Sequence, residues 1–327
     1  MKPSALRKKP AFPEEPEKLP APAVPTKDLI SIHDLPVETV HEILTLAAHM
    51  KKNPAAYRNA LAGKQLAMLF EKPSLRTRAS FEVGMYELGG HAVYFGPSEV
   101  GLGRRESVPD VARNLSRWFH GITLRAFRHE TVIELAATAS IPVINALSDL
   151  LHPCQALADY FTLQEHMDLR GLTLAFVGDG NNVAHSLAFG AAKLGVTLRI
   201  ATPEGYEPNA RLMGESRADA RSTGGRIATL HDPAVAVSGA DAVYTDVWTS
   251  MGQEAEAEIR RTVFRPYQVD RELMARARPG AFFLHCLPAR RGEEVTAEVI
   301  DSPYSLAFEQ AENRLHVAKA ILYLWLH

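Results

Sequence analysis

Short apolar runs rich in β-branched residues alternate with longer amphipathic stretches from Leu29 onward. This alternation is typical of repeated βαβ units that build a mainly parallel sheet. Helical periodicity fills the stretches between the apolar runs. In the first half of the chain we expect strands at residues 65–70, 91–95, 122–127 and 142–147, and helices at residues 78–88, 108–119 and 130–140.

A second series of the same kind follows a predicted helix at residues 153–166. Its expected strands are residues 172–177, 197–201, 226–230, 242–246 and 281–285, and residues 309–326 form a final amphipathic helix. The predicted fold class is therefore α/β, with two doubly wound, mainly parallel-sheet domains. We expect one domain at residues 28–160, completed by the C-terminal helix at 309–327, and the other at residues 161–308.

Open α/β sheets bind their ligands in the crevice outside the carboxyl ends of the strands. The unusual polar clusters of this chain follow predicted strands, with few exceptions. We therefore expect the active site in the cleft between the two domains, where such clusters from both sheets can face one ligand.

The 327 residues have ordinary globular composition, 46% hydrophobic and 23% charged, which fits about two domains. Lys and Arg number 36 against 38 Asp and Glu, so bulk charge does not favour nucleic acid or an anionic membrane as a partner. The sequence has no run of about 18 apolar residues that would predict a membrane span. Cys154 and Cys286 are too few for a disulfide scaffold, and a reducing cytosol fits better.

Residues 1–27 contain seven prolines and charges of both signs, and they lack the compact apolar core of a signal peptide. Such a segment buries little apolar surface, so we expect a disordered tail. Its glutamates argue against a transit peptide, which is normally poor in acidic residues. Together with the cysteine content, this predicts a cytoplasmic protein.

The loop at residues 70–78 follows a predicted strand and opens a predicted helix. Ser74 is a good N-cap candidate, and the first-turn amides of a helix have no intrahelical partners. With Arg76, Thr77 and Arg78 they make an anion cradle suited to phosphate. The loop lacks the glycine-rich run of a Walker A motif. A capped helix with surface arginines is the alternative interpretation.

Arg125 falls within an apolar predicted strand, where a cation is costly unless it is paired or functional. An edge strand with a solvated arginine explains the pattern equally well. Pro153 marks a helix start and leaves His152 at the cap, three residues before Gln155. An imidazole and a carboxamide on one side of a helix suit a small carbonyl-and-amide group such as carbamoyl. A structural histidine is the alternative.

Residues 178–182 end the first strand of the second series and invite a dinucleotide-binding interpretation. Val183 occupies the position of the third glycine, so that fingerprint fails. An NAD-dependent dehydrogenase would also need an acidic residue at the end of the next strand, where residues 201–203 read Ala-Thr-Pro. Asn182 remains as a polar group at a helix start, where capping is an equally good explanation.

Asp246 ends another predicted strand, and its carboxylate could bind an ammonium group. Cys286 follows His285 at the end of the last strand, and neighbouring strand residues point to opposite faces. This weakens a histidine-activated thiol nucleophile. No second Cys/His pair occurs at zinc spacing, so we expect no metal site. Taken singly, each of these loops favours turn structure over function.

Together the motifs resemble the aspartate/ornithine carbamoyltransferase family over nearly the whole chain after residue 27. The family's Ser-x-Arg-Thr-Arg and His-Pro-x-Gln elements are matched at residues 74–78 and 152–155. The Asp-x-x-x-Ser-Met-Gly and His-Cys-Leu-Pro loops, which distinguish ornithine enzymes, are matched at residues 246–252 and 285–288. Residues 312–314, Glu-Asn-Arg, also match. Four ordered motifs in one chain are far more specific than any one of them.

The resemblance implies transfer of a carbamoyl group from carbamoyl phosphate to the δ-amine of L-ornithine, giving citrulline and phosphate in arginine biosynthesis. A related amine such as putrescine or acetylornithine is the alternative acceptor. Arg125, His152 and Cys286 would act at the reacting group. Carbamoyl phosphate would be held by Ser74, Leu75, Arg76, Thr77, Arg125, His152, Gln155, Cys286, Leu287 and Arg314, and ornithine by Asn182, Asp246, Ser250 and Met251.

Positioning and stabilisation of a tetrahedral oxyanion suffice for this reaction, so no metal or organic cofactor is expected. The resemblance also implies a homotrimer or a multiple of trimers with shared sites. Residues 96–105, where relatives contribute a loop to the neighbouring site, lack the glutamine that some members carry. A phosphate-binding module without catalysis would not need Asp246, Cys286 and Arg314 in addition to residues 74–78, the expected phosphate loop.

Overall fold

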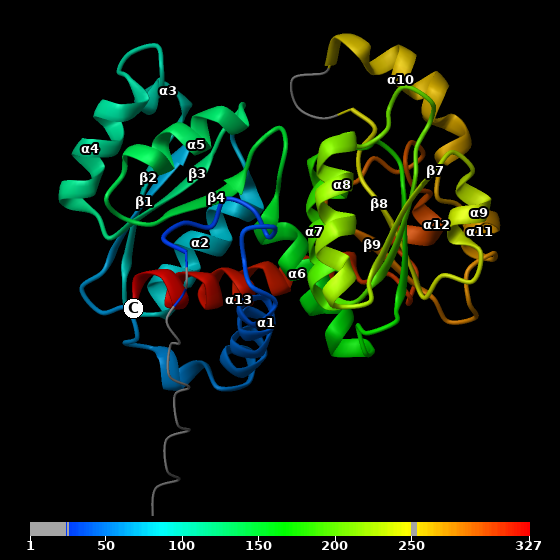
Figure 1. Ribbon diagram of the computed structural model, residues 1–327, viewed down its shortest axis with the longest axis horizontal. Helices are drawn as coiled ribbons and strands as arrows, with labels where there is room; N and C mark the ends of the chain where they lie inside the picture. The colour runs from blue at the N-terminus through cyan, green and yellow to red at the C-terminus, as the bar shows by residue number, and fades with distance from the viewer. Residues whose placement is uncertain (1–23, 25, 250–253) are drawn as a thin grey trace, which may run out of the picture.

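The computed structural model describes residues 24, 26–249 and 254–327, and these residues form two α/β lobes that lie side by side (Figure 1). The strands of each lobe pair in one parallel sheet. In both sheets the strand order reverses in the middle, which is the doubly wound arrangement. The predicted fold class is confirmed.

The first sheet has the strand order β2-β1-β3-β4. Its strands are β1 (Gln65–Phe70), β2 (His91–Phe95), β3 (Gly121–Arg125) and β4 (Val143–Leu147). The side chains of β3 and β4 are buried on both faces, as in a parallel sheet covered by helices. The helices of this lobe are α1 (Val37–Lys52), η1 (Pro54–Tyr57), α2 (Leu75–Glu87), α3 (Pro97–Val100), α4 (Val108–Trp118), α5 (His129–Thr138) and α6 (Pro153–His166).

The second sheet has the order β7-β6-β5-β8-β9. Its strands are β5 (Thr173–Val177), β6 (Thr197–Ala201), β7 (Arg226–Leu230), β8 (Ala242–Thr245) and β9 (Phe282–His285). The accompanying helices are α7 (Asn182–Leu194), α8 (Ala210–Asp219), η2 (Ala220–Ser222), α9 (Pro233–Val237), η3 (Glu254–Glu256), α10 (Ala257–Phe264), η4 (Arg265–Tyr267), α11 (Arg271–Met274) and α12 (Ala297–Ile300).

The last helix, α13 (Ala307–Leu326), returns to the first lobe and packs against α1, α2 and α6, as Figure 1 shows in red. Every residue from Val317 to Leu326 is buried, so this half of the helix is a core element and not an amphipathic surface helix. Its return was predicted, and it places Arg314 at the junction of the lobes.

Several predicted boundaries differ from the structure for local reasons. Helix α2 begins at Leu75, three residues before the predicted start, because Ser74 caps it. Strand β3 ends at Arg125 and not at residue 127, and the Phe127 N–H donates to Glu71 Oε2 at 2.8 Å. Because β3 lies between β1 and β4, the edge-strand explanation of Arg125 is wrong.

The predicted tail, residues 1–27, lies outside the described residues except for residues 24, 26 and 27. Lys27 donates to the carbonyl oxygens of Ala136 and Ala139 at 2.7 and 2.6 Å. The Lys27 side chain therefore already contacts the first lobe. None of the helices in the described part of the chain combines the length and the apolar character that a membrane crossing requires.

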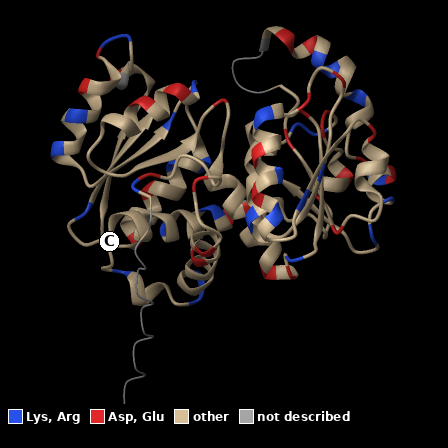
Figure 2. Cartoon of the chain, in the orientation of Figure 1, with Lys and Arg blue, Asp and Glu red and all other residues tan. Residues whose placement is uncertain are grey.

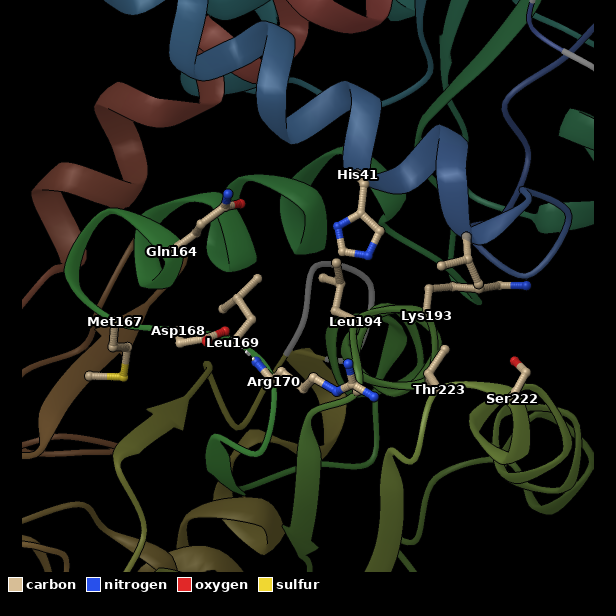
Figure 3. Close-up of a pocket in the computed structure, with 12 residues that line it drawn as sticks. His41, Gln164, Met167, Asp168, Leu169, Arg170, Lys193, Leu194, Ser222 and Thr223 are labelled. Atoms are coloured by element: carbon tan, nitrogen blue, oxygen red, sulfur yellow. Dashed lines mark hydrogen bonds between the residues drawn. The ribbon is translucent and has the colours of Figure 1, made fainter.

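A pocket of about 700 Å³ lies at the amino ends of the second sheet's strands, between α1, the segment that follows α6 and the end of α7 (Figure 3). His41 points into it from α1, toward Leu169 and Leu194 of the second lobe. The site described below lies at the opposite, carboxyl ends of the strands, so this pocket is separate from it.

Candidate active site

A cleft of about 810 Å³ lies between the two lobes, at the carboxyl ends of their strands. It receives the loop after β1 and the end of β3 from one sheet, and the loops after β5 and β8 from the other. These are the points where the strand orders reverse, which is where open α/β sheets bind ligands. The described residues that the sequence predicted all line it: Ser74, Leu75, Arg76, Thr77, Arg125, His152, Gln155, Asn182, Asp246, Cys286, Leu287 and Arg314.

Two predicted ornithine contacts, Ser250 and Met251, lie outside the described residues. The segment that leads to them is described as far as Thr249, whose side chain also lines the cleft.

The start of α2 has the predicted N-cap. Ser74 has an extended backbone, and its Oγ accepts a hydrogen bond from the Thr77 N–H at 3.2 Å, so it is the N-cap of α2. The start of the 13-residue helix therefore lies in the cleft wall beside Arg76. Burial lowers the pKa of Arg76, although Cys286 and Asp246 across the cleft oppose the shift. This wall is suited to a phosphate group.

Arg125 ends the central strand β3, and only 6% of its surface is exposed. Burial, and then the neighbouring charges of Arg314 and Arg76, lowers its pKa to about 10, so the guanidinium remains protonated at neutral pH. Within the described residues its Nε has no hydrogen-bond partner. A buried donor of this kind costs stability unless a ligand accepts from it.

His152 occupies the cap position of α6, as predicted, but its side chain makes no capping hydrogen bond. Its backbone N–H donates to Ser186 Oγ of α7 at 2.7 Å, which joins the two lobes behind the cleft. Burial, followed by the charges of Arg314 and Arg125, holds the pKa of His152 well below its usual value. A neutral imidazole can donate a hydrogen bond to a carbonyl oxygen without carrying charge.

Arg314 reaches the cleft from α13 and is almost fully buried. It donates to Gln155 Oε1 and, at 2.8 Å, to Thr77 Oγ1. The terminal helix therefore holds together the phosphate loop and the start of α6. A carboxamide oxygen in this position is an acceptor on the wall of the cleft.

Lys72 lines the same wall, but sequence reasoning assigned it no role. It is 8% exposed, and its Nζ lies 5.2 Å from the centre of the Phe127 ring. Burial, and then the charge of Arg125, lowers its pKa to about 8. Its position in the sequence could have identified Lys72, because it lies in the loop between β1 and the cap Ser74, next to the residues that were expected to bind an anion.

The loop after β5 corrects one expectation. Capping of α7 had been considered for Asn182, but the cap is Asn181, whose Oδ1 accepts from the Val183 and Ala184 amides. The Asn182 side chain instead donates to the carbonyl oxygen of Ser148 at 2.6 Å, across the lobes. The asparagine pair therefore divides between building the helix start and contacting the opposite wall.

Asp246 follows β8 and faces the cleft. Its carboxylate accepts from Asn181 Nδ2 at 2.9 Å and from the Cys286 thiol at 3.1 Å. Burial, and then the charge of Asp246, raises the pKa of Cys286 well above its usual value. The thiol is therefore protonated at neutral pH and acts as a hydrogen-bond donor. It is not a nucleophile in this state, because only the thiolate is nucleophilic.

Asp246, His285 and Cys286 bring possible metal ligand atoms within 4.8 Å of one another. However, His285 Nδ1 accepts from the Leu287 N–H at 2.9 Å, and Nε2 contacts Glu294 Oε1 at 3.2 Å. Both ring nitrogens of His285 are thus engaged, so it offers no free ligand atom. Metal ligands must be deprotonated and free to bind, so this set does not fit a metal ion.

Charges of both signs are spread over both lobes (Figure 2), so the charge of the cleft is a local property. Among the charged side chains that line the cleft, the first lobe contributes mainly cations, namely Lys72, Arg76, Arg125 and Arg314 besides Asp149. The second lobe contributes Asp246 and Glu207, together with Asp179, which is paired with Arg260, and Arg290. An anion with a polarised carbonyl group fits the first wall, and an amino group fits the second.

The carbamoyl-P binding domain model of the aspartate/ornithine carbamoyltransferases matches residues 27–165, and the Asp/Orn binding domain model matches residues 170–325. The ornithine carbamoyltransferase of Thermococcus kodakarensis is 52% identical over 301 residues, covering 91% of this chain and 96% of that protein. The anabolic ornithine carbamoyltransferase of Pyrococcus furiosus is 51% identical over 301 residues, with the same coverage. A solved structure of ornithine carbamoyltransferase from Pyrococcus furiosus has a TM-score of 0.89 at 50% identity, covering 92% of this chain and 97% of that one. The chain therefore belongs to the aspartate/ornithine carbamoyltransferase family.

Proposed function

We propose that this enzyme transfers the carbamoyl group of carbamoyl phosphate to the δ-amine of L-ornithine, forming L-citrulline and phosphate. The observation that carries the proposal is the division of one cleft into a cationic wall with a helix N-terminus and a facing wall with Asp246. The names of the relatives reported above support ornithine as the acceptor.

Carbamoyl phosphate binds to the first wall in this proposal. Ser74, Arg76, Thr77 and the α2 amides hold the phosphate, and Leu75 contributes its backbone to the same turn. Arg125 and neutral His152 donate to the carbonyl oxygen as it becomes an oxyanion, the usual largest contribution in acyl transfer. Their buried nitrogens support this role, because Arg125 Nε and His152 Nδ1 have no hydrogen-bond partner among the described residues.

Ornithine binds to the second wall. Asp246 accepts from its α-ammonium group, and Asn182 with Ser250 and Met251 holds the rest of the amino-acid head. The δ-amine, with a free pKa of about 10.4, attacks the carbonyl carbon after losing its proton. Cys286 and Leu287 lie between the two substrates and contact the reacting end. The carbon–nitrogen bond forms, the carbon–oxygen bond to phosphate breaks, and neither step needs a redox group.

The first lobe, residues 28–160 with the helix at 309–327, is the proposed carbamoyl phosphate domain, and residues 161–308 are the ornithine domain. We propose a biosynthetic role in the cytoplasm and a homotrimer or multiple of trimers. Exposed apolar side chains on α2 support self-association, because Leu75 and Tyr86 are 79% and 80% exposed. They lie on the helix that begins at the phosphate loop.

Steady-state assays of citrulline and phosphate release test the proposal. With carbamoyl phosphate, L-ornithine should be used with a kcat/KM at least about a hundred-fold above putrescine, acetylornithine and aspartate. Putrescine lacks the α-carboxylate and acetylornithine the free α-ammonium group, and a site built for a polar group strongly rejects analogues that lack it. Aspartate has no δ-amine to accept the carbamoyl group. Equal or better turnover of putrescine or acetylornithine would select the alternative acceptor. Failure with all four amines would reject the function itself.

A further inference from the structure

Asp159 is a fully buried carboxylate on α6, one turn after Gln155, and the roles proposed above do not use it. Three side chains donate to it. Gln155 Nε2 and Gln310 Nε2 lie 2.7 and 2.8 Å from Oδ1, and the Tyr244 hydroxyl lies 3.0 Å from Oδ2. Buried carboxylates are rare, and three donors from α6, α13 and β8 form a built environment for this one.

The carboxylate determines how the two glutamine amides are rotated. An ionised carboxylate only accepts hydrogen bonds, so each amide must present its NH₂ group to Asp159 and its oxygen in the opposite direction. Gln155 Oε1 then accepts from Arg314 on the wall of the cleft. Gln310 Oε1 accepts from the His285 N–H at 2.8 Å, which holds the start of the Cys286 loop.

Burial raises the pKa of Asp159 to about 6, against the lowering effect of its three donors. The group is therefore mainly ionised above pH 7. The titratable or charged groups that face it are Arg314 from α13, Tyr244 from β8, Tyr160 from α6 and Cys286 after β9.

We propose that Asp159 is a positioning residue for carbamoyl transfer, which fixes the Gln155 carboxamide so that its oxygen accepts from the carbamoyl NH₂ group. The inference rests on the proposed function. If Gln155 turned over, its NH₂ would face both the Arg314 guanidinium and the carbamoyl NH₂, placing donors against donors. The loss of this acceptor would weaken the binding of carbamoyl phosphate more than the binding of ornithine.

A double-mutant cycle with two isosteric changes, Gln155→Glu and Asp159→Asn, measures this contact. In Q155E two carboxylates meet at the 2.7 Å contact, and we expect the KM for carbamoyl phosphate to rise at least about ten-fold at pH 8. This rise in KM should become smaller toward pH 6, because the two carboxylates can share one proton. Alone, D159N should raise this KM only about three-fold, because its amide oxygen still accepts from the glutamines.

In the double variant the NH₂ group of the asparagine introduced at position 159 can donate to the glutamate introduced at position 155, whose other oxygen again faces the cleft. Gln310, which donates to the same oxygen of Asp159 in the wild type, then loses its acceptor, so the rescue is partial. The double variant should therefore lose at least about half of the KM increase of Q155E, on a logarithmic scale. The matched control is Glu165→Gln, which removes the same charge from α6 near its end, where Glu165 contacts Lys51 and Asn313. E165Q should not reduce the rise in KM for carbamoyl phosphate that Q155E causes. In both Q155E variants the KM for ornithine should change much less than that for carbamoyl phosphate.

Additive effects of Q155E and D159N, or equal suppression by E165Q, would overturn the inference. Should Q155E fail to fold, Asp159→Leu replaces it: the KM for carbamoyl phosphate must rise at least about ten-fold in D159L and far less in D159N, and equal values would contradict the role. An inactive wild-type enzyme would instead reject the proposed function, which separates the two failures.

Discussion

Arg125 illustrates at the residue scale how ligand binding and stability can conflict. Its guanidinium is buried in the centre of a sheet, close to the charges of Arg76 and Arg314, and its Nε has no partner among the described residues. Such an arrangement opposes folding and favours an anionic or strongly polarised ligand. The sequence pattern located the residue, but only the strand order decided between a solvated edge cation and a buried one.

Arg125→Gln should therefore separate the two effects. We expect kcat to fall by about 10²–10³-fold, the usual loss on removal of one oxyanion donor. Thermal unfolding should occur at the same or a higher temperature than in the wild type, because a buried, repelled charge has been removed. Near-normal turnover would refute the role of Arg125 at the carbonyl oxygen.

Asp246→Ala should weaken L-ornithine binding by at least about ten-fold, because the ammonium group loses its carboxylate partner. Binding of carbamoyl phosphate, on the opposite wall, should change by less than about two-fold, as expected for separate sites. Titration calorimetry with each substrate compares the two affinities. Unchanged ornithine affinity would show that another group holds the ammonium.

Lys72 predicts a pH dependence of carbamoyl phosphate binding. Its pKa of about 8 means that it is charged below pH 8 and neutral above in the free cleft. Bound phosphate favours the charged form, so affinity should fall as pH rises from 7 to 9, by up to about ten-fold. Carbamoyl phosphate stays a dianion over this range, since the second pKa of a phosphate ester is about 6.

The control is Lys72→Arg, which remains charged throughout and should flatten the profile. Calorimetry at pH 7, 8 and 9 measures both proteins. A wild-type affinity that rises or stays level over this range would mean that Lys72 does not contact the phosphate.

At the scale of elements, helix packing can require a residue that helix propensity disfavours. Gly190 on α7 faces Tyr160 of α6, and a Cβ there would lie 2.3 Å from the tyrosine Cε2. The same tyrosine hydroxyl donates to the Leu187 carbonyl oxygen at 2.6 Å. The absence of a side chain therefore lets the two helices, one from each lobe, approach closely behind the cleft.

Gly190→Ala should destabilise the protein by about 1–3 kcal/mol through overpacking, although alanine is the better helix former. Gly214→Ala is the matched control, since α8 is also a helix and a Cβ at this exposed position meets no atom within 4 Å. It should stabilise by about 0.5–1 kcal/mol. Denaturant unfolding of both variants checks the opposite signs, and equal signs would refute the packing argument.

The local sequence pattern predicted individual helices and strands well, but it did not predict contacts between residues that are distant in sequence. The strand at residues 65–70 and the helix that starts at Pro153 were predicted with the observed boundaries, because a short continuous apolar run and a proline start are local signals. Asp159 could not have been found in this way, since its importance depends on Gln310 and Tyr244, which are distant in sequence. The same holds for Arg314, which the family resemblance identified and periodicity did not.

At the scale of the whole molecule, function depends on two sheets that present their carboxyl ends to one cleft. In this proposal neither wall is sufficient for transfer, because the cationic cradle at the start of α2 and the Asp246 carboxylate bind different substrates. Helix α13 and the start of α7 connect the two lobes, because Gln310 accepts from the His285 N–H and Ser186 accepts from the His152 N–H. The rule that ligands bind at the carboxyl ends of parallel strands predicted the cleft, whereas the assignment of one substrate to each wall required the resemblance.

The most direct test is a crystal structure with a bisubstrate mimic that joins a phosphonate, through an acyl group, to the δ-amine of ornithine. The phosphonate should contact Ser74, Arg76 and Thr77, the acyl oxygen should contact Arg125 and His152, and the α-ammonium group should contact Asp246. A mimic bound to one wall only, or an empty cleft at saturating concentration, would contradict the account.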